Sequence, residues 1–273
     1  MKFTTKKLLL ISGLVIFVLV GNRDFYLKNG SLQQSNLKTR LQKMEMQYET
    51  ELTRDFTKNN IQNLKINVDN ENVKIHAGNS FKVYICYLIN TDQKPLIHLK
   101  DNTLNVKAFT EKADYLAFRP KMEVTIPAKK KLNKLTITKQ NGKIDMQNLQ
   151  IETTKLKLHT GNFTCKKFIS KKLKIIAKNE NINFNKVNLN RLNLENQKGD
   201  IDLYKLTTTK LSHIKNDNGD ITLKKFNTPG LDVSTAMGKV QIQGRRQKES
   251  RYKTGNKKLT LKIQTNAGDI ELE

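Results

Sequence analysis

Two near-copies decide the fold of this chain: "KGDIDLYKL" at residues 198–206 and "NGDITLKKF" at residues 218–226. In each copy a glycine is followed by apolar residues at alternate positions, which is the period of a β-strand. The same glycine recurs along the chain at intervals of 19, 38, 20 and 19 residues, at Gly142, Gly161, Gly199, Gly219 and Gly238. A fixed period of this length indicates a repeat architecture.

The repeat unit reads Leu-x-Ile, four residues, Gly-x-Ile-x-Leu, two residues and Leu, as in "LTITKQNGKIDMQNL" at 135–149. One unit is too short to enclose a core, but stacked units place each inward residue on its equivalent about 4.8 Å away. We therefore predict an all-β fold containing a parallel β-solenoid (β-helix) of about seven short rungs. The inward column after the glycine is expected to run through Ile144, Phe163, Ile182, Ile201, Ile221, Val240 and Ile270.

Three irregularities interrupt the repeat. Glu180 occupies a corner where the other units have glycine, the residue best suited to a turn with positive φ. The spacing between Leu211 and Gly219 is one residue longer than in the other units, which predicts a bulge near His213 and Ile214. The last interval contains a surplus of polar and basic residues, "RRQKESRYKTGNK" at 245–257.

The N-terminus has the layout of a secretory signal, with lysines before the apolar run of residues 8–20. Because no small-residue cleavage site follows, we expect an uncleaved anchor over residues 1–22, with the N-terminus cytoplasmic and the bulk of the chain extracytoplasmic. Secretion after signal cleavage is the alternative. Elsewhere in the chain, Cys86 and Cys165 are each expected to be a buried free thiol.

Residues 23–60 are predicted to form a helical stalk or linker. The apolar stripe lies at helical spacings and contains Leu37, Leu41, Met44, Tyr48, Leu52 and Phe56. A juxtamembrane stalk, a self-associating coiled coil and a helix packed on the next domain all fit this stripe. From residue 61 the period changes to two, so we expect a leading β-strand region over 61–130 and the solenoid repeats over 131–273.

Basic side chains recur with the period of the repeat. One series contains Lys167, Lys186, Lys205 and Lys225, and a second contains Lys172, Arg191 and Lys210. Stacking converts each series into a vertical row of like charges, and the formal net charge of the whole chain is +25. These seven residues are our candidates for binding a polyanion, such as an anionic cell-wall polymer or lipid headgroups. Protection of the sheet from aggregation is the alternative explanation for the lysines.

The acidic residues Asp200, Asp202 and Asp220 raise a different possibility. Stacked carboxylates are the acid and base of polysaccharide-cleaving β-helix enzymes, and they also bind calcium. Calcium needs six to eight oxygen ligands and an enzyme needs a cleft, so solvated turn residues are the simpler interpretation. No catalytic residue is assigned.

Other functional classes lack their motifs. The four histidines share no ligand spacing and there is no Cys-x-x-Cys pair, so no metal site and no cofactor are predicted. Nucleic acid fits the charge, but the aromatic platforms that stack single strands are missing, and we expect no nucleic-acid partner.

The stretch "MEVTIPAKKKLNKLTITKQNGKI" at 122–144, followed by repeated "NGDI" turns, resembles the putative-adhesin β-strand-repeat family of bacterial cell-envelope proteins, a domain of unknown function. The resemblance covers residues 61–273 and carries no catalytic residues. It implies a non-catalytic bacterial surface protein that interacts with another envelope component or acts in the envelope stress response. A carbohydrate-active enzyme and a purely structural surface spacer remain the alternatives.

Overall fold

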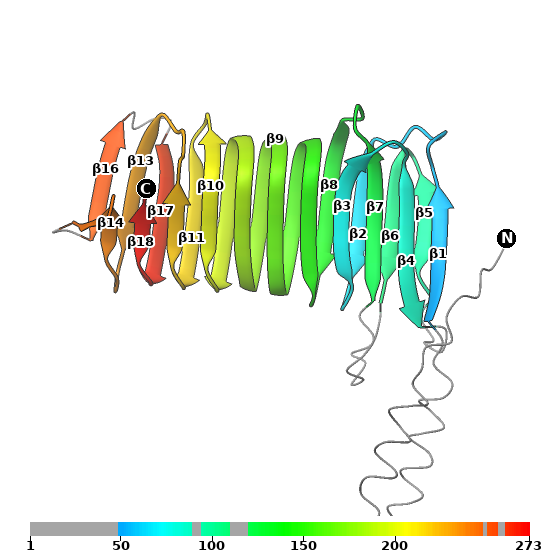
Figure 1. The fold of residues 1–273 in the computed structure, drawn as a ribbon, viewed down its shortest axis with the longest axis horizontal. Coiled ribbons are helices and arrows are strands. Elements are labelled where there is room, and N and C mark those ends of the chain that lie inside the picture. The colour runs from blue at the N-terminus through cyan, green and yellow to red at the C-terminus, as the bar shows by residue number, and fades with distance from the viewer. Residues whose placement is uncertain (1–48, 89–93, 110–119, 248–249, 256–259) are drawn as a thin grey trace, which may run out of the picture. The chain divides into compact units, whose positions relative to one another are not determined.

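The structure is a computed structural model, and it describes residues 49–88, 94–109, 120–247, 250–255 and 260–273 (Figure 1). The chain divides into two compact units. One comprises Met1–Thr50 and Leu88–Asn90, nearly all of it outside the described residues, and the other comprises Glu51–Tyr87 and Thr91–Glu273. The predicted anchor over 1–22 lies outside the described residues. Within the part that is described, no helix has the length and apolarity needed to cross a membrane.

All regular structure in the described residues is β-strand, as the sequence predicts from residue 61 onward. In chain order the strands are β1 (Glu49–Asp55), β2 (Asn63–Val68), β3 (Asn72–Gly78), β4 (Lys82–Leu88), β5 (Leu96–Lys100), β6 (Thr103–Ala108), β7 (Lys121–Pro127), β8 (Leu132–Lys139), β9 (Lys143–Lys198), β10 (Ile201–Thr208), β11 (Ser212–Asn218), β12 (Ile221–Lys224), β13 (Gly230–Thr235), β14 (Val240–Ile242), β15 (Arg245–Arg246), β16 (Arg251–Gly255), β17 (Thr260–Ala267) and β18 (Ile270–Leu272).

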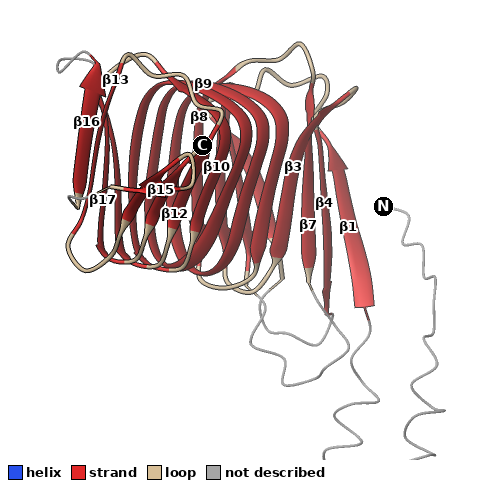
Figure 2. Ribbon diagram, turned by 60° about the vertical axis from the view of Figure 1, so that its left-hand side comes forward, coloured by secondary structure: helices blue, strands red, loops and turns tan. Residues whose placement is uncertain are grey.

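Strand β9 is the clearest expression of the repeat, because its 56 residues wind continuously through successive turns of one coil (Figures 1 and 2). Parallel pairing fixes the register between turns: Ile137 lies beside Leu156, and Ile201 lies beside both Ile182 and Ile221. The inward residues therefore form columns along the coil axis, which is the solenoid-like arrangement that the 19-residue period predicts.

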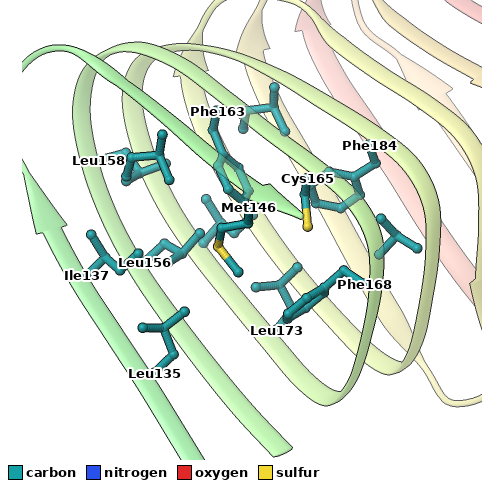
Figure 3. Close-up of a cluster of buried hydrophobic side chains, with 14 of the residues drawn as sticks. Leu135, Ile137, Met146, Leu156, Leu158, Phe163, Cys165, Phe168, Leu173 and Phe184 are labelled. Carbon is teal, nitrogen blue, oxygen red and sulfur yellow. The ribbon is translucent and has the colours of Figure 1, made fainter. Parts of the chain in front are cut away.

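The interior is filled by large apolar side chains from neighbouring turns (Figure 3). Phe163 and Phe184 meet edge to face, with ring centroids 6.0 Å apart. Cys165 is fully buried among them and burial raises the pKa of its thiol well above the usual value. Cys86 is also a buried free thiol, so both cysteines are as predicted.

Glycine at the corner is required by the close approach of adjacent turns. At Gly161 φ is +141°, and a Cβ atom there would overlap the carbonyl oxygen of Gly142 in the preceding turn. Residues with side chains are strained in this backbone region. The recurring glycine is therefore explained by backbone geometry rather than by chemistry.

At both ends of the coil the turns do not stack in sequence order. The predicted order of the inward column, in which Val240 follows Ile221 and Ile270 comes last, is therefore wrong. Ile270 of β18 lies between Ile221 of β12 and Val240 of β14. In the same way, β2 lies between β6 and β8, with Leu64 beside both Leu104 and Leu135. An inward column accepts any apolar residue of similar size at each turn, so the sequence period does not determine which two turns of the coil lie next to each other.

Antiparallel strands flank the coil at each end. Strands β15 and β16 pair with β14 and β13, and β4 and β5 pair with β7 and β6. The surplus stretch at 245–257 supplies β15 and β16. These strands cover backbone donors and acceptors of the terminal turns that would otherwise be open to pairing with other chains.

The helical stalk predicted over residues 23–60 is wrong where the structure describes it. Residues 49–55 form β1, which pairs with β4, and the N–H of Phe56 donates a hydrogen bond of 2.7 Å to the carbonyl of Phe81. The spacing of four between Tyr48, Leu52 and Phe56 is even, so it fits one face of a strand as well as one stripe of a helix. Residues 56–60 form a turn, and residues 23–48 of the predicted helix lie outside the described residues.

Candidate functional site: two basic ladders and the groove between them

The first basic ladder consists of Lys167, Lys186, Lys205 and Lys225. Each of these lysines lies at a corner of the coil, two residues after an inward apolar residue such as Leu203. All four residues have left-handed backbone angles, with φ between 50° and 59°. Asn148 takes the same conformation in the preceding turn, with φ of 56°. This conformation costs an ordinary L-residue roughly 1–2 kcal/mol, and only Gly, Asn and Asp adopt it readily. Backbone geometry therefore does not explain why lysine recurs here.

The ammonium groups of the first ladder are not neutralised by the protein. The four lysines are exposed, and within the described part of the chain none of them forms an ion pair. The pairing of Tyr204 with Lys224 fixes Lys205 and Lys225 on adjacent turns. The ladder is thus a row of like charges repeated at the spacing between strands, about 4.8 Å.

Tyr204 contacts two members of this ladder, a relationship that the spacing of the basic residues does not reveal. The Nζ atoms of Lys205 and Lys225 lie 5.3 Å and 5.6 Å from the centroid of its ring. Partial desolvation raises the pKa of Tyr204, but hydrogen bonding to Lys225 and the charges of both lysines outweigh it, so that the pKa is lowered. Cation–π contacts of this kind restrict the motion of the lysine side chains. The only sequence signal was the Tyr-Lys pair itself.

The second basic ladder, defined as Lys172, Arg191 and Lys210, starts the next strand of each turn. All three side chains are exposed and none has an ion pair in the described residues. Lys172 precedes Arg191 by one 19-residue period, and the N–H of Lys210 donates a hydrogen bond of 2.8 Å to the carbonyl oxygen of Asn190, the residue before Arg191. The register against the preceding turn changes from 19 residues at Thr208–Leu189 to 20 residues at His213–Asn193, so the extra residue lies between Thr208 and His213, just before the predicted position. The hydroxyl of Ser212 accepts the N–H of Leu192 there, at 3.0 Å.

A shallow groove of about 160 Å³ lies between the two ladders. The chain order places it there, since each turn passes from the first ladder through the groove to the second, as in Lys186, Asn188 and Arg191. The residues that line the groove and matter for its chemistry are Gln150, Ile169, Asn188, Asn190, Thr207 and Thr209. Lys171 and Glu152, which also line it, form an ion pair with each other.

The aspartates of the "NGDI" turns have a structural role. Oδ1 of Asp200 accepts the backbone N–H of Asp220 at 3.0 Å, and Oδ1 of Asp220 accepts that of Asp269 at 2.8 Å. Oδ1 of Asn181 likewise accepts the backbone N–H of Asp200, at 3.1 Å. Asp202 is exposed on the outer face of the strand, beside Asn183 and Thr222. The structure thus aligns Asp200 with Asp220, but one oxygen of each is used to join adjacent turns.

The interior also contains an ion pair between two residues that are far apart in the sequence. Nζ of Lys139 lies 2.7 Å from Oε1 of Glu180, and both side chains are fully buried. Glu180 therefore replaces a corner glycine because its carboxylate has a partner in the core. The sequence contains one sign of this pair, since Lys139 occupies a position at which the side chains of the repeat point inward.

One family model and several solved structures resemble this chain. The sequence matches the family described as Toastrack DUF4097 over residues 61–273. Comparison with curated protein sequences finds no match. Similar solved structures include a putative adhesin from Bacteroides fragilis (14% identity, 82% of this chain and 97% of that chain, TM-score 0.46). Two others are a putative cell adhesion protein from Clostridium sporogenes (14%, 82% and 99%, TM-score 0.36) and a putative lipid binding protein from Parabacteroides distasonis (13%, 82% and 97%, TM-score 0.41).

Proposed function

Because the chain belongs to the Toastrack DUF4097 family, a putative-adhesin domain of unknown function, its role has to be argued from its own surface, and we propose that it binds an anionic polymer of the cell envelope through the two basic ladders. In this proposal the protein is a non-catalytic surface protein. Residues 1–22 anchor it in the cell membrane with the N-terminus cytoplasmic, and the solenoid lies outside the cytoplasm.

The observation that carries the proposal is the left-handed backbone of Lys167, Lys186, Lys205 and Lys225. At such a corner asparagine is the less strained residue, as at Asn148. Four successive lysines in this position are accounted for if their ammonium groups are needed at the surface.

The electrostatics of an unpaired row favour a polymer over small anions. Two unit charges about 4.8 Å apart repel by only about 0.9 kcal/mol in bulk water, so the free protein tolerates the row. A linear polyanion lying along it removes this repulsion at every step and displaces its own counterions. The net charge of the whole chain, +25, adds a long-range attraction for the same ligand.

The test compares two variants that each remove four positive charges from the full chain. The ladder variant replaces Lys167, Lys186, Lys205 and Lys225 by Asn, and the control variant replaces the exposed, unpaired lysines Lys65, Lys107, Lys155 and Lys157 by Gln. The probe is poly(glycerol phosphate), titrated at low salt with the wild type and with both variants.

We expect the ladder variant to lose roughly a hundredfold in affinity, since four ammonium–phosphate contacts of about 0.7 kcal/mol are removed. The control should keep most of the wild-type affinity. Equal losses in both variants would show that only net charge matters, and no binding by the wild type would leave a structural spacer as the better account.

A further inference from the structure

The groove is lined mainly by uncharged polar side chains, in contrast to the ladders on either side, although Lys131 and the Lys171–Glu152 ion pair also line it. It presents the amides of Gln150, Asn188 and Asn190 and the hydroxyls of Thr207 and Thr209. None of these five side chains has a hydrogen-bond partner in the described part of the structure. Donors and acceptors are therefore available together on this face.

The same groups are aligned along the axis of the solenoid. Asn188 pairs in register with Thr207, and Thr207 forms a bridge with Asn227 on the following turn. Ile169, on the turn before Asn188, is 49% exposed and adds an apolar patch to the floor. A ligand that follows the ladders thus also passes over a row of hydroxyl and amide groups.

Phosphate groups alone do not satisfy all the hydrogen-bonding and apolar groups on this floor. An amide or hydroxyl side chain both donates and accepts, and its best complement is a ligand hydroxyl, which does the same. An exposed isoleucine contacts C–H groups, which a carbon chain supplies and an inorganic phosphate chain lacks.

We infer that the groove selects a hydroxylated linear polyanion, a polyol phosphate chain that lies parallel to the solenoid axis. Its phosphates contact the two basic ladders, while its hydroxyl and C–H groups contact Asn188, Thr207 and Ile169. The inference rests on the proposed function and adds the chemical class of the ligand to it. A flat lipid surface touches the projecting lysines but does not fill the hollow between them.

The test compares poly(glycerol phosphate) with inorganic polyphosphate of matched chain length, which carries the charge without hydroxyl or C–H groups. A groove variant combines Asn188→Leu with Thr207→Val. A matched control variant carries the same two kinds of change on another face, Asn183→Leu and Thr222→Val, at positions that flank Asp202 in register. All four side chains are at least partly exposed, so the fold is expected to tolerate both variants.

The wild type should prefer poly(glycerol phosphate) by about tenfold, the effect of one or two additional hydrogen bonds. The groove variant should lose this preference and still bind polyphosphate, and the control should keep it. Equal affinity of the wild type for both polymers overturns the inference and leaves the proposed function standing. Failure to bind either polymer overturns the proposed function. Stronger binding to vesicles of anionic lipid, unaffected by the groove variant, would assign the ladders to a membrane surface instead.

Discussion

Lys139 and Glu180, which lie 41 residues apart in the sequence, form an ion pair inside the solenoid, with Nζ 2.7 Å from Oε1 and 3.0 Å from Oε2. The same ammonium group donates to the carbonyl oxygens of Gly142 and Thr160, at 2.8 Å and 3.2 Å. It passes Gly161, where a Cβ would come within 2.9 Å of Nζ. The pair therefore connects turns on either side of a glycine that leaves room for it.

Removing one partner should destabilise the protein more than removing both. Lys139→Met leaves a carboxylate in the core, and we expect the free energy of unfolding to fall by about 3–5 kcal/mol. The double variant with Glu180→Met replaces the pair by apolar groups and should return close to the wild-type value or exceed it. Urea unfolding measures both. Losses that simply add in the double variant would contradict this description of the pair.

The ion pair also predicts a pH dependence. Burial raises the pKa of Glu180 above its usual 4.5, so the stability from this shift is complete below pH 4.5 and is lost as pH rises through the raised value. Burial lowers the pKa of Lys139 below its usual 10.5, so the stability from this shift is present above pH 10.5 and is lost as pH falls through the lowered value.

Relative to the Lys139→Met, Glu180→Met double variant, the wild type should therefore have its lowest unfolding free energy between these two windows, near neutral pH. Urea unfolding at acid, neutral and alkaline pH checks this. A wild type that is relatively most stable at neutral pH would mean that attraction between the charges outweighs their desolvation.

The left-handed lysines should limit stability. Replacing Lys186 by Asn is expected to raise the free energy of unfolding by about 1 kcal/mol, since asparagine adopts this backbone region with less strain. Lys166 is the control, because it is an exposed strand residue without positive φ, and Asn there should give no gain. The same response at both positions would contradict the strain argument.

The insertion of β18 between β12 and β14 is directly testable with engineered cysteines. Thr222 lies beside Glu271, and Glu271 lies beside Gln241, so Thr222 and Gln241 are two strands apart. Cysteines at 222 and 271 should form a disulfide, since adjacent strands bring Cα atoms within the usual 4.4–6.8 Å. Cysteines at 222 and 241 should not, and preferential bonding of that pair would restore the sequence order of turns. Mass spectrometry of the oxidised chain distinguishes the two.

Much of the fold follows from sequence periodicity. Inward residues such as Ile144, Ile182 and Ile201 are identified by alternation, and the 19-residue interval gives their register. The order of the terminal turns does not follow, because Ile221, Val240 and Ile270 are interchangeable as column members. Their order is determined by long-range pairing, visible only in contacts such as Asp220 with Asp269.

The candidate site was predicted in part. The spacing of the basic residues identified both ladders, but it gave no information on backbone conformation, and Lys167 reads like any exposed strand residue until its φ is known. The groove was missed because Asn188 and Thr207 are unremarkable polar residues in sequence. Their significance comes from lying between two rows of charge, a relationship that needs the cross-section of the coil.

The most direct test of the polymer-binding proposal is lysine footprinting of the full chain, with and without poly(glycerol phosphate). An amine-acylating reagent is applied briefly and each lysine is quantified by mass spectrometry. We expect the polymer to protect Lys167, Lys186, Lys205 and Lys225 strongly while Lys65, Lys107, Lys155 and Lys157 keep their reactivity, since all eight are exposed in the free protein. Equal protection of the two sets, or protection of the second set alone, would contradict the assignment of the ladders and the groove as the binding site.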